Sequence, residues 1–349
     1  MQIYRIYDDY NFWNVRPDDD DDISFLPVYS VTNTRLEVHD EDVIAILTGT
    51  FSFSGSPQTI SEVSGTVSEI AVYSSGNQEL LEYRAFSPNF DFANIKVYNF
   101  QAELDALAGD DTFQGSPYGL NDALQTLAGN DIFIGLGDEE GDFGDVWFAG
   151  SGIDTSVYRG NLGEYAINNN ALIYDLRVND GSQVPGMTVR DSVAGRDGYD
   201  QLNDVERLQF NDFNLAYDIN GHAGQAYRLY QAAFDRTPDA GGLGYWIAQR
   251  DANVSMQDIA YSFVVSEEFR AQYGPDSSNE TFINALYMNV LNREADAGGY
   301  DYWLGLMNDG LSRQDMLAEF SESPENQANV FDAIANGIVY VAQTQIEII

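Results

Sequence analysis

The sequence contains no cysteine, only two histidines and a single lysine, Lys96. Without cysteine the chain can form neither a disulfide framework nor a thiolate metal site. His39 and His222 stand far apart in the sequence, so the ligands of an ordinary zinc site are missing as well. An all-carboxylate site for a hard cation remains open.

Several familiar motifs are also missing. No stretch reaches the roughly eighteen uninterrupted apolar residues of a membrane span, and residues 1–25 lack the basic and apolar regions of a secretory signal peptide. There is no Gly-x-Ser-x-Gly elbow, His-Glu-x-x-His helix, phosphate loop or dinucleotide fingerprint. We therefore expect a protein that is not an enzyme and has no catalytic residues. A pair of carboxylates that hydrolyses glycans is the one enzymatic alternative that remains.

Positive charge is scarce: 56 acidic residues against 16 basic ones give a formal net charge of −40. Such a field repels nucleic acid and anionic lipid, so neither is expected as a partner. Cations are the natural partners of this surface. The composition suits a salty or calcium-rich exterior, where counterions screen the repulsion between carboxylates.

The pattern of residues predicts a multidomain α+β protein in three parts. Residues 1–104 contain β-branched and aromatic runs such as "VIAILTGTFSFSG", separated by Gly, Ser, Pro and Asn, and indicate an antiparallel β domain. The aspartates of residues 18–22 are interpreted as a solvated loop. Residues 105–220 form the second part, and residues 221–349 form a helical third part.

The second part is rich in glycine and aspartate. "LAGDDTF", "LAGNDIF" and "GSGIDTS" place Asp111, Asp131 and Asp154 in equivalent positions. Asp122 precedes Asp131 by nine residues, and Asp145 precedes Asp154 by nine. A nonapeptide period therefore survives, with insertions between the copies. Strand-like runs follow as far as residue 218, and "VERLQF" marks their end.

This segment resembles the calcium-binding β-roll of RTX proteins, which are secreted by the type I pathway. In that family, turns of six residues bind calcium through an aspartate and backbone carbonyls, and three further residues form a short strand. The resemblance implies calcium as the cofactor, held by the aspartates and turn glycines at matching positions: Asp111, Asp131, Asp154, Asp122, Asp145, Gly109 and Gly129. It implies strand anchors at Phe113, Phe133 and Trp147. Most of the paired glycines of the family are absent, so about one to three ions, or a metal-free structural remnant, are the alternatives.

The third part repeats itself. Shifting the sequence by 57 residues aligns residues 229–269 with residues 286–326 without a gap, and Arg-x-x-Asp-x-x-Gly-x-x-Tyr-Trp occurs in both copies. Apolar residues three and four apart predict helices. Ser255 and Ser312 are expected N-caps, with Asp258 and Asp315 three residues later. Trp246 and Trp303 are interpreted as core residues.

The repeat resembles a helical domain of unknown function that is found at the ends of secreted bacterial proteins and is distantly similar to phycobilisome linker domains. That resemblance implies a packing module for association and no catalysis. Arg236 with Asp239, and Arg293 with Asp296, are expected to form local salt bridges that fix a turn. The last residues, "GIVYVAQTQIEII", predict either a C-terminal secretion signal or a final helix or strand docked on the bundle.

Together these patterns predict a secreted, non-enzymatic, calcium-binding structural or adhesive protein of a bacterial cell surface, such as a surface layer, filament or matrix. Its expected partners are calcium ions, further copies of itself, and other surface proteins or glycans. The alternative is a soluble module that binds a glycan or a partner through the aromatic residues of "MQIYRIYDDYNFW".

Overall fold

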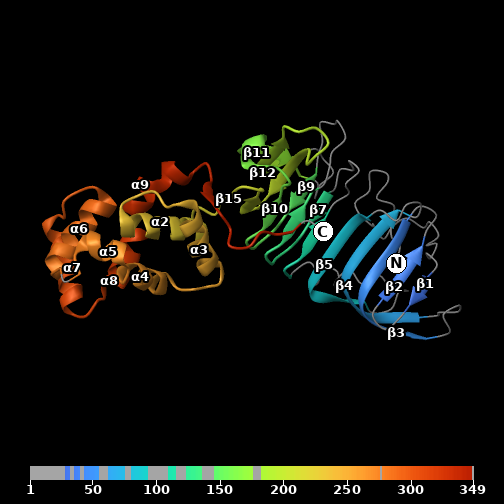
Figure 1. Ribbon diagram of the computed structural model, residues 1–349, viewed down its shortest axis with the longest axis horizontal. Coiled ribbons are helices and arrows are strands. Elements are labelled where there is room, and N and C mark those ends of the chain that lie inside the picture. Colours follow the sequence, from blue (N-terminus) through green and yellow to red (C-terminus); the bar gives the residue numbers. More distant parts are fainter. Residues whose placement is uncertain are drawn as a thin grey trace. The chain divides into compact units, whose positions relative to one another are not determined.

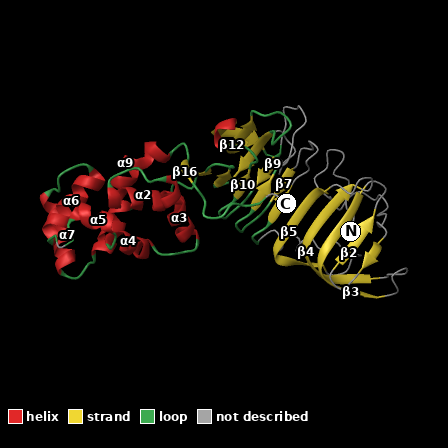
Figure 2. Ribbon diagram, in the orientation of Figure 1, coloured by secondary structure: helices red, strands yellow, loops and turns green. Residues whose placement is uncertain are grey.

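A computed structural model describes the chain over ten ranges: 28–31, 35–39, 43–54, 62–74, 80–92, 109–114, 123–135, 145–175, 182–275 and 277–347. The chain divides into two compact units (Figure 1). The first comprises Met1–Asn211 with Ile346–Ile349, and the second comprises Asp212–Gln345. Within the described residues the first unit is built mainly of strands and the second mainly of helices, as Figure 2 shows. The expected α+β class with a helical C-terminal region is therefore confirmed.

The first unit begins with an antiparallel sheet. Each strand pairs with the next in the chain, in the order β1 (Val28–Val31), β2 (Arg35–His39), β3 (Val43–Ser54), β4 (Glu62–Ser74) and β5 (Leu80–Phe92). Alternation of β-branched and aromatic residues with small polar ones favours these long strands. β5 also pairs antiparallel with β6 (Thr112–Gln114), so the sheet continues into the glycine- and aspartate-rich segment.

That segment winds through short parallel strands that alternate between two sheets. One sheet stacks β6, β8 (Ile132–Ile134), β10 (Thr155–Val157) and β14 (Arg207–Gln209) in parallel. The other stacks β7 (Ala123–Gln125), β9 (Val146–Phe148) and β13 (Tyr199–Asn203). Each passage of the chain through one strand of each sheet is called a coil below.

The core of the coils contains apolar side chains from both sheets. Phe113 pairs in register with Phe133, and both are buried. The ring of Phe133 lies 5.5 Å from that of Trp147 on the other sheet, centre to centre, and Trp147 is fully buried. All three predicted strand anchors are thus core residues.

One hairpin interrupts the coils. After β10 the chain forms a short 3₁₀ turn (Leu162–Glu164) and the antiparallel strands β11 (Tyr165–Tyr174) and β12 (Gln183–Asp191). β12 then pairs antiparallel with β13, which returns the chain to the second sheet. The hairpin therefore lengthens that sheet to the order β11-β12-β13-β9-β7.

The second unit contains two sets of helices between paired strands β15 (Asn214–Ala216) and β16 (Ile338–Tyr340). The first set is α2 (His222–Phe234), α3 (Ala240–Asp251), α4 (Met256–Val264) and α5 (Glu267–Tyr273). The second set is α6 (Asn279–Leu291), α7 (Ala297–Asn308), α8 (Arg313–Ser321) and α9 (Pro324–Ile334). The bounds of α6, α7 and α8 are those of α2, α3 and α4 moved by 57 residues.

Both predicted serine caps begin helices. Ser255 accepts a hydrogen bond from the backbone N–H of Asp258 at the start of α4, and Ser312 accepts one from Asp315 at the start of α8. These bonds satisfy donors that a helix N-terminus leaves without an intrahelical partner. The caps occupy the same place in the two sets of helices, so they fix equivalent starts.

The tryptophans pack within their own set of helices. Trp246 lies edge-on to Phe263, with ring centres 4.7 Å apart, and Trp303 packs against Phe320 at 5.1 Å. Trp246 therefore joins α4 to α3, and Trp303 joins α8 to α7. Both are partly buried and pack against the helical core rather than lying wholly within it.

Candidate functional site

A row of acidic residues occupies one edge of the coils. Asp111 precedes β6, Asp131 precedes β8, Asp154 precedes β10, and Glu206 precedes β14. The four strands are parallel and in register, so residues at the same distance before each strand stack on one another. We call these four residues the acidic ladder.

Hydrogen bonds join each rung of the acidic ladder to the next. The backbone N–H of Asp111 donates to Oδ1 of Asp131 at 2.9 Å, and that of Asp131 donates to Oδ1 of Asp154 at 2.7 Å. The N–H of Asp154 donates to Oε2 of Glu206 at 3.0 Å. Each carboxyl group therefore fixes the backbone of the coil before it, and the predicted residues Asp111, Asp131 and Asp154 are brought together.

A second row of bonds runs beside the acidic ladder, one residue earlier in each turn. The N–H of Asn130 donates to Oδ1 of Asp110 at 2.7 Å, and the N–H of Ile153 donates to Oδ1 of Asn130 at 2.9 Å. Asp110 and Asn130 are exposed, whereas the acidic ladder residues beside them are buried. The outer row thus holds the turns together without burying charge.

Glycines allow these turns to approach one another closely. Gly129 has a φ of +126°, and a Cβ atom there would lie 2.0 Å from the carbonyl oxygen of Gly109. Gly152 has a φ of +156°, and a Cβ there would lie 1.6 Å from the carbonyl oxygen of Gly129. Only glycine accepts both this conformation and this contact. The predicted turn residues Gly109 and Gly129 are therefore stacked with their carbonyl groups at the coil edge.

Burial opposes ionisation of the acidic ladder. Burial raises the pKa of Asp131 to about 6 and that of Asp154 to about 8, where the neighbouring carboxylates of Asp131 and Glu206 add repulsion. Burial also raises the pKa of Glu206. Without a counter-charge, the central rungs therefore hold their protons at pH values where ordinary carboxyl groups have lost them.

Two oxygens of the acidic ladder are available as ligands. Oδ2 of Asp131 and Oδ2 of Asp154 are buried and accept no hydrogen bond from the described part of the chain. Within that part, no three acidic or histidine side chains are grouped as a metal centre. A calcium ion at this edge would therefore take single carboxylates from successive turns, together with backbone carbonyl oxygens, which is a donor set that calcium accepts.

Another predicted ligand, Asp145, belongs to the opposite edge. Asp145 lies directly before β9, is buried, and its carbonyl oxygen accepts a hydrogen bond from the N–H of Gln201 at 2.7 Å. Because Val146 pairs with Gln201, Asp200 holds the equivalent place in the next coil and is also buried. Asp122 lies outside the described residues.

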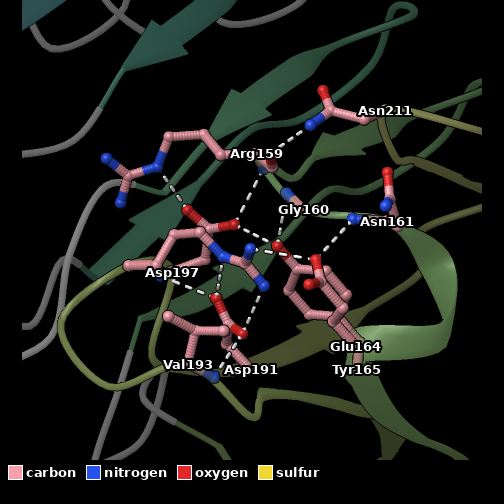
Figure 3. Close-up of polar contacts among 10 residues, drawn as sticks. Arg159, Gly160, Asn161, Glu164, Tyr165, Asp191, Val193, Asp197 and Asn211 are labelled. Carbon is pink, nitrogen blue, oxygen red and sulfur yellow. Dashed lines mark hydrogen bonds and ion pairs between the residues drawn. The ribbon is translucent and has the colours of Figure 1, made fainter.

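A polar network anchors the hairpin to the end of β10, as Figure 3 shows. Asp197 accepts bonds from the Arg159 backbone N–H at 2.8 Å, the Arg159 Nε at 2.5 Å, and the Tyr165 hydroxyl. Asp191 binds the guanidinium of Arg196 through both oxygens, at 2.6 and 2.7 Å. Each buried carboxylate here has an arginine partner, so this cluster is a structural anchor of β11 and β12.

In the helical unit, the predicted turn pairs form but are not the strongest contacts. Arg236 Nη1 lies 3.7 Å from Asp239 Oδ2, and Arg293 Nη1 lies 3.4 Å from Asp296 Oδ2. The closer partners are the first-turn glutamates of α5 and α9: Arg236 Nε lies 2.8 Å from Glu268, and Arg293 Nε lies 2.6 Å from Glu325. Asp239 and Asp296 cap α3 and α7.

Sequence reasoning missed Glu206, the fourth rung of the acidic ladder. It lies 52 residues after Asp154, beyond the hairpin, and carries glutamate where the other rungs carry aspartate. The phrase "VERLQF", interpreted only as a boundary, contains it. Val205 and Leu208, the apolar residues that flank Glu206 and Arg207, are both buried, and this apolar pattern in the phrase was the available signal.

Comparison with known proteins adds one match. A family model described as a domain of unknown function, DUF4214, matches residues 260–330, from α4 to α9. No curated protein matches the sequence. None of the helices in the described ranges is long and apolar enough to cross a membrane. The family match covers only part of the helical unit, and its description assigns no activity.

Proposed function

We propose that the chain is a secreted, non-enzymatic, calcium-binding protein of the RTX type, and that it serves as a structural or adhesive component of a bacterial cell surface. The acidic ladder is the observation that carries this proposal. The carboxyl groups of Asp111, Asp131 and Asp154 are buried one above another, and one oxygen each of Asp131 and Asp154 lacks a hydrogen-bond partner among the described residues. A cation would compensate the charge that burial otherwise disfavours.

The ligands in this proposal come from successive turns. Asp131 and Asp154 would each supply Oδ2, and the stacked carbonyl groups of Gly109 and Gly129 lie at the same edge of the coils. Calcium, when bound, supplies the positive charge that lets both carboxyl groups ionise. Asp145 belongs to a second row on the opposite edge, where Asp200 follows it in the next coil.

Folding of the coils would then depend on the compartment. Where calcium is scarce, as inside the cell, repulsion and burial cost leave the acidic segment loosely structured. Where calcium is plentiful, ion binding is coupled to closure of the coils. This coupling suits a protein that must remain unfolded during export and become rigid outside the cell.

Titration calorimetry of the metal-free full chain tests the proposal. We expect heat of calcium binding in the wild type, and weaker binding in Asp131→Asn and Asp154→Asn, because an amide oxygen carries no charge. Asp301→Asn, an exposed position on α7, is the matched control and should bind calcium as the wild type does. Absence of calcium binding, or binding that neither ladder variant weakens, would reject the acidic ladder as the site.

A further inference from the structure

One contact between the two sets of helices has no counterpart on the equivalent faces. α2, from the first set, packs against α8, from the second. Arg228 on α2 is buried and binds Glu322, the C-cap of α8, through Nε at 2.8 Å and Nη2 at 2.7 Å. Because α6 is equivalent to α2 and α4 is equivalent to α8, the same contact could in principle form between α6 and α4.

Among the described residues, the equivalent faces are instead partly or largely exposed. Adding 57 to the residue numbers makes Ala285 the counterpart of Arg228, and Glu322 the counterpart of Val265, which is 40% exposed. Tyr261 on α4 is 55% exposed, whereas its counterpart on α8, Ala318, is 5% exposed. We call Tyr261 and Val265 the α4 face.

The second open surface lies on α6. Met288 is 50% exposed, whereas its counterpart Gln231 on α2 is only partly exposed. Ala285 lies three residues before Met288 on the same side of the helix. It is partly buried against the helical core, so Met288 provides most of the exposed surface. We call Ala285 and Met288 the α6 face.

We propose that the α4 face of one molecule binds the α6 face of a second copy of this chain, in the way that α8 binds α2 within the molecule. The residues that stand in place of the internal ion pair are both apolar, so they suit contact with each other. The internal contact joins arginine to glutamate, and the proposed one joins alanine to valine, flanked by methionine and tyrosine. Neither face leaves a charged group buried without a partner, which would be costly.

The charge of the chain favours these faces for contact between copies. Two molecules of net charge −40 repel each other over most of their surface. α6 has one charged residue, Glu280, among its 13, and α4 has one, Asp258, among its nine. Apolar contact can therefore form here with little electrostatic opposition from the two helices themselves.

The proposed contact is heterologous, because two different faces meet. Each bound molecule leaves one face free for a further copy, so the contact produces rings or open chains rather than closed dimers. This inference rests on the assembly part of the proposed function and names its surface. It does not involve the acidic ladder, so calcium binding and assembly can fail independently.

Complementation between two variants of the full chain tests the geometry. Light scattering coupled to size exclusion should show wild-type mass rising with concentration beyond a dimer. Tyr261→Glu and Met288→Glu should each remain monomeric, and an equimolar mixture of the two should form dimers only, because each variant retains the face that the other lacks. Tyr302→Glu, at a 60% exposed tyrosine on α7, should assemble as the wild type does.

Cysteine cross-linking provides a second readout, because the chain has no cysteine of its own. Treatment of a mixture of Val265→Cys and Ala285→Cys chains with a bis-maleimide cross-linker, which spans the distance between the two positions, should give a linked heterodimer, and Val265→Cys with Tyr302→Cys should not. A monomeric wild type, a mixture of glutamate variants that stays monomeric, or preferential Val265→Cys homodimers would overturn the proposal. Calcium calorimetry on the same variants reports the acidic ladder separately.

Discussion

The backbone N–H of Asp131 donates a 2.7 Å hydrogen bond to Oδ1 of Asp154, which lies 23 residues later and one coil further along. The same carboxyl group keeps its other oxygen buried without a hydrogen bond from the described residues. Asp154 therefore both positions the neighbouring turn and retains a ligand atom. This double role lets the effects of shape and of charge be separated experimentally.

Substituting Asp154 by asparagine should act in opposite directions with and without calcium. Asparagine keeps an oxygen that can accept the bond from Asp131, but it removes the carboxyl group that burial disfavours. In chelator near neutral pH, we expect the variant to gain on the order of 2 kcal/mol in the free energy of unfolding. In calcium it should lose stability. Urea unfolding in both conditions measures this, and a shift of the same sign in both would contradict it.

The stability of the metal-free coils should fall as the pH rises. Unfolded Asp154 loses its proton near its ordinary pKa of 3.8, whereas the folded residue keeps it to about pH 8. The folded state binds more protons between these values, so stability is greatest at the acid end and falls as pH rises from about 4 to about 8. Thermal melts in chelator should show this fall, and calcium should flatten it. Equal slopes in both conditions would count against ligation by this residue.

The helical unit should respond to pH in the opposite direction. The N–H of Gly242 lowers the pKa of Asp239, and the N–H of Gly299 lowers that of Asp296. Stability from these caps is present above the ordinary carboxyl pKa and is lost as pH falls below it. Helical circular dichroism in acid should decline less steeply in an Asp239→Asn, Asp296→Asn double variant, because asparagine caps without titrating.

Gly152 should tolerate no side chain. Gly152→Ala would place a Cβ atom 1.6 Å from the Gly129 carbonyl oxygen at a φ of +156°, so the turn must move and the ladder bonds of Asp131 and Asp154 must break. We expect a loss of at least about 3 kcal/mol. Gly163→Ala, where a Cβ would meet nothing within 4 Å, should change stability by less than about 0.5 kcal/mol. Equal effects in the two variants would argue against the stacked turn.

Two arginines in the helical unit should contribute differently to stability, because one is buried and the other is more exposed. Arg228→Met removes a buried guanidinium that binds Glu322, and we expect a loss of about 2 kcal/mol, because Glu322 then keeps a partly buried charge without its partner. Arg293→Met breaks the more exposed pair with Glu325 and should cost less than about 1 kcal/mol. Denaturant unfolding of the two variants provides the comparison, and a larger loss for Arg293→Met would contradict the greater contribution expected of the buried pair.

Local features of the fold could be predicted because they depend on neighbours in sequence. The helical period and the serines at 255 and 312 indicated helices and their starts, and both caps form. The Gly-x-Asp pattern placed Asp111, Asp131 and Asp154 in equivalent positions, and these residues stack in the structure.

Features that join distant segments could not be predicted in the same way. Glu206 joins the ladder only because the hairpin of β11 and β12 returns the chain to the coils. Gln209 binds the backbone of Ile346 through both atoms of its side-chain amide, at 2.8 and 2.9 Å, across 137 residues. No sequence periodicity connects such pairs. The contact of Arg228 with Glu322 could not be predicted from either copy of the repeat, because it joins one copy to the other.

Hydrogen–deuterium exchange in calcium and in chelator tests the central claim most directly, because it reports separately on each segment. We expect calcium to slow exchange in residues 109–114, 123–135 and 145–157, which contain the first three rungs of the acidic ladder, and to leave exchange in helices α2 to α9 unchanged. Identical exchange of those coil segments in the two conditions, with the protein saturated in calcium, would contradict the claim that the ion closes them.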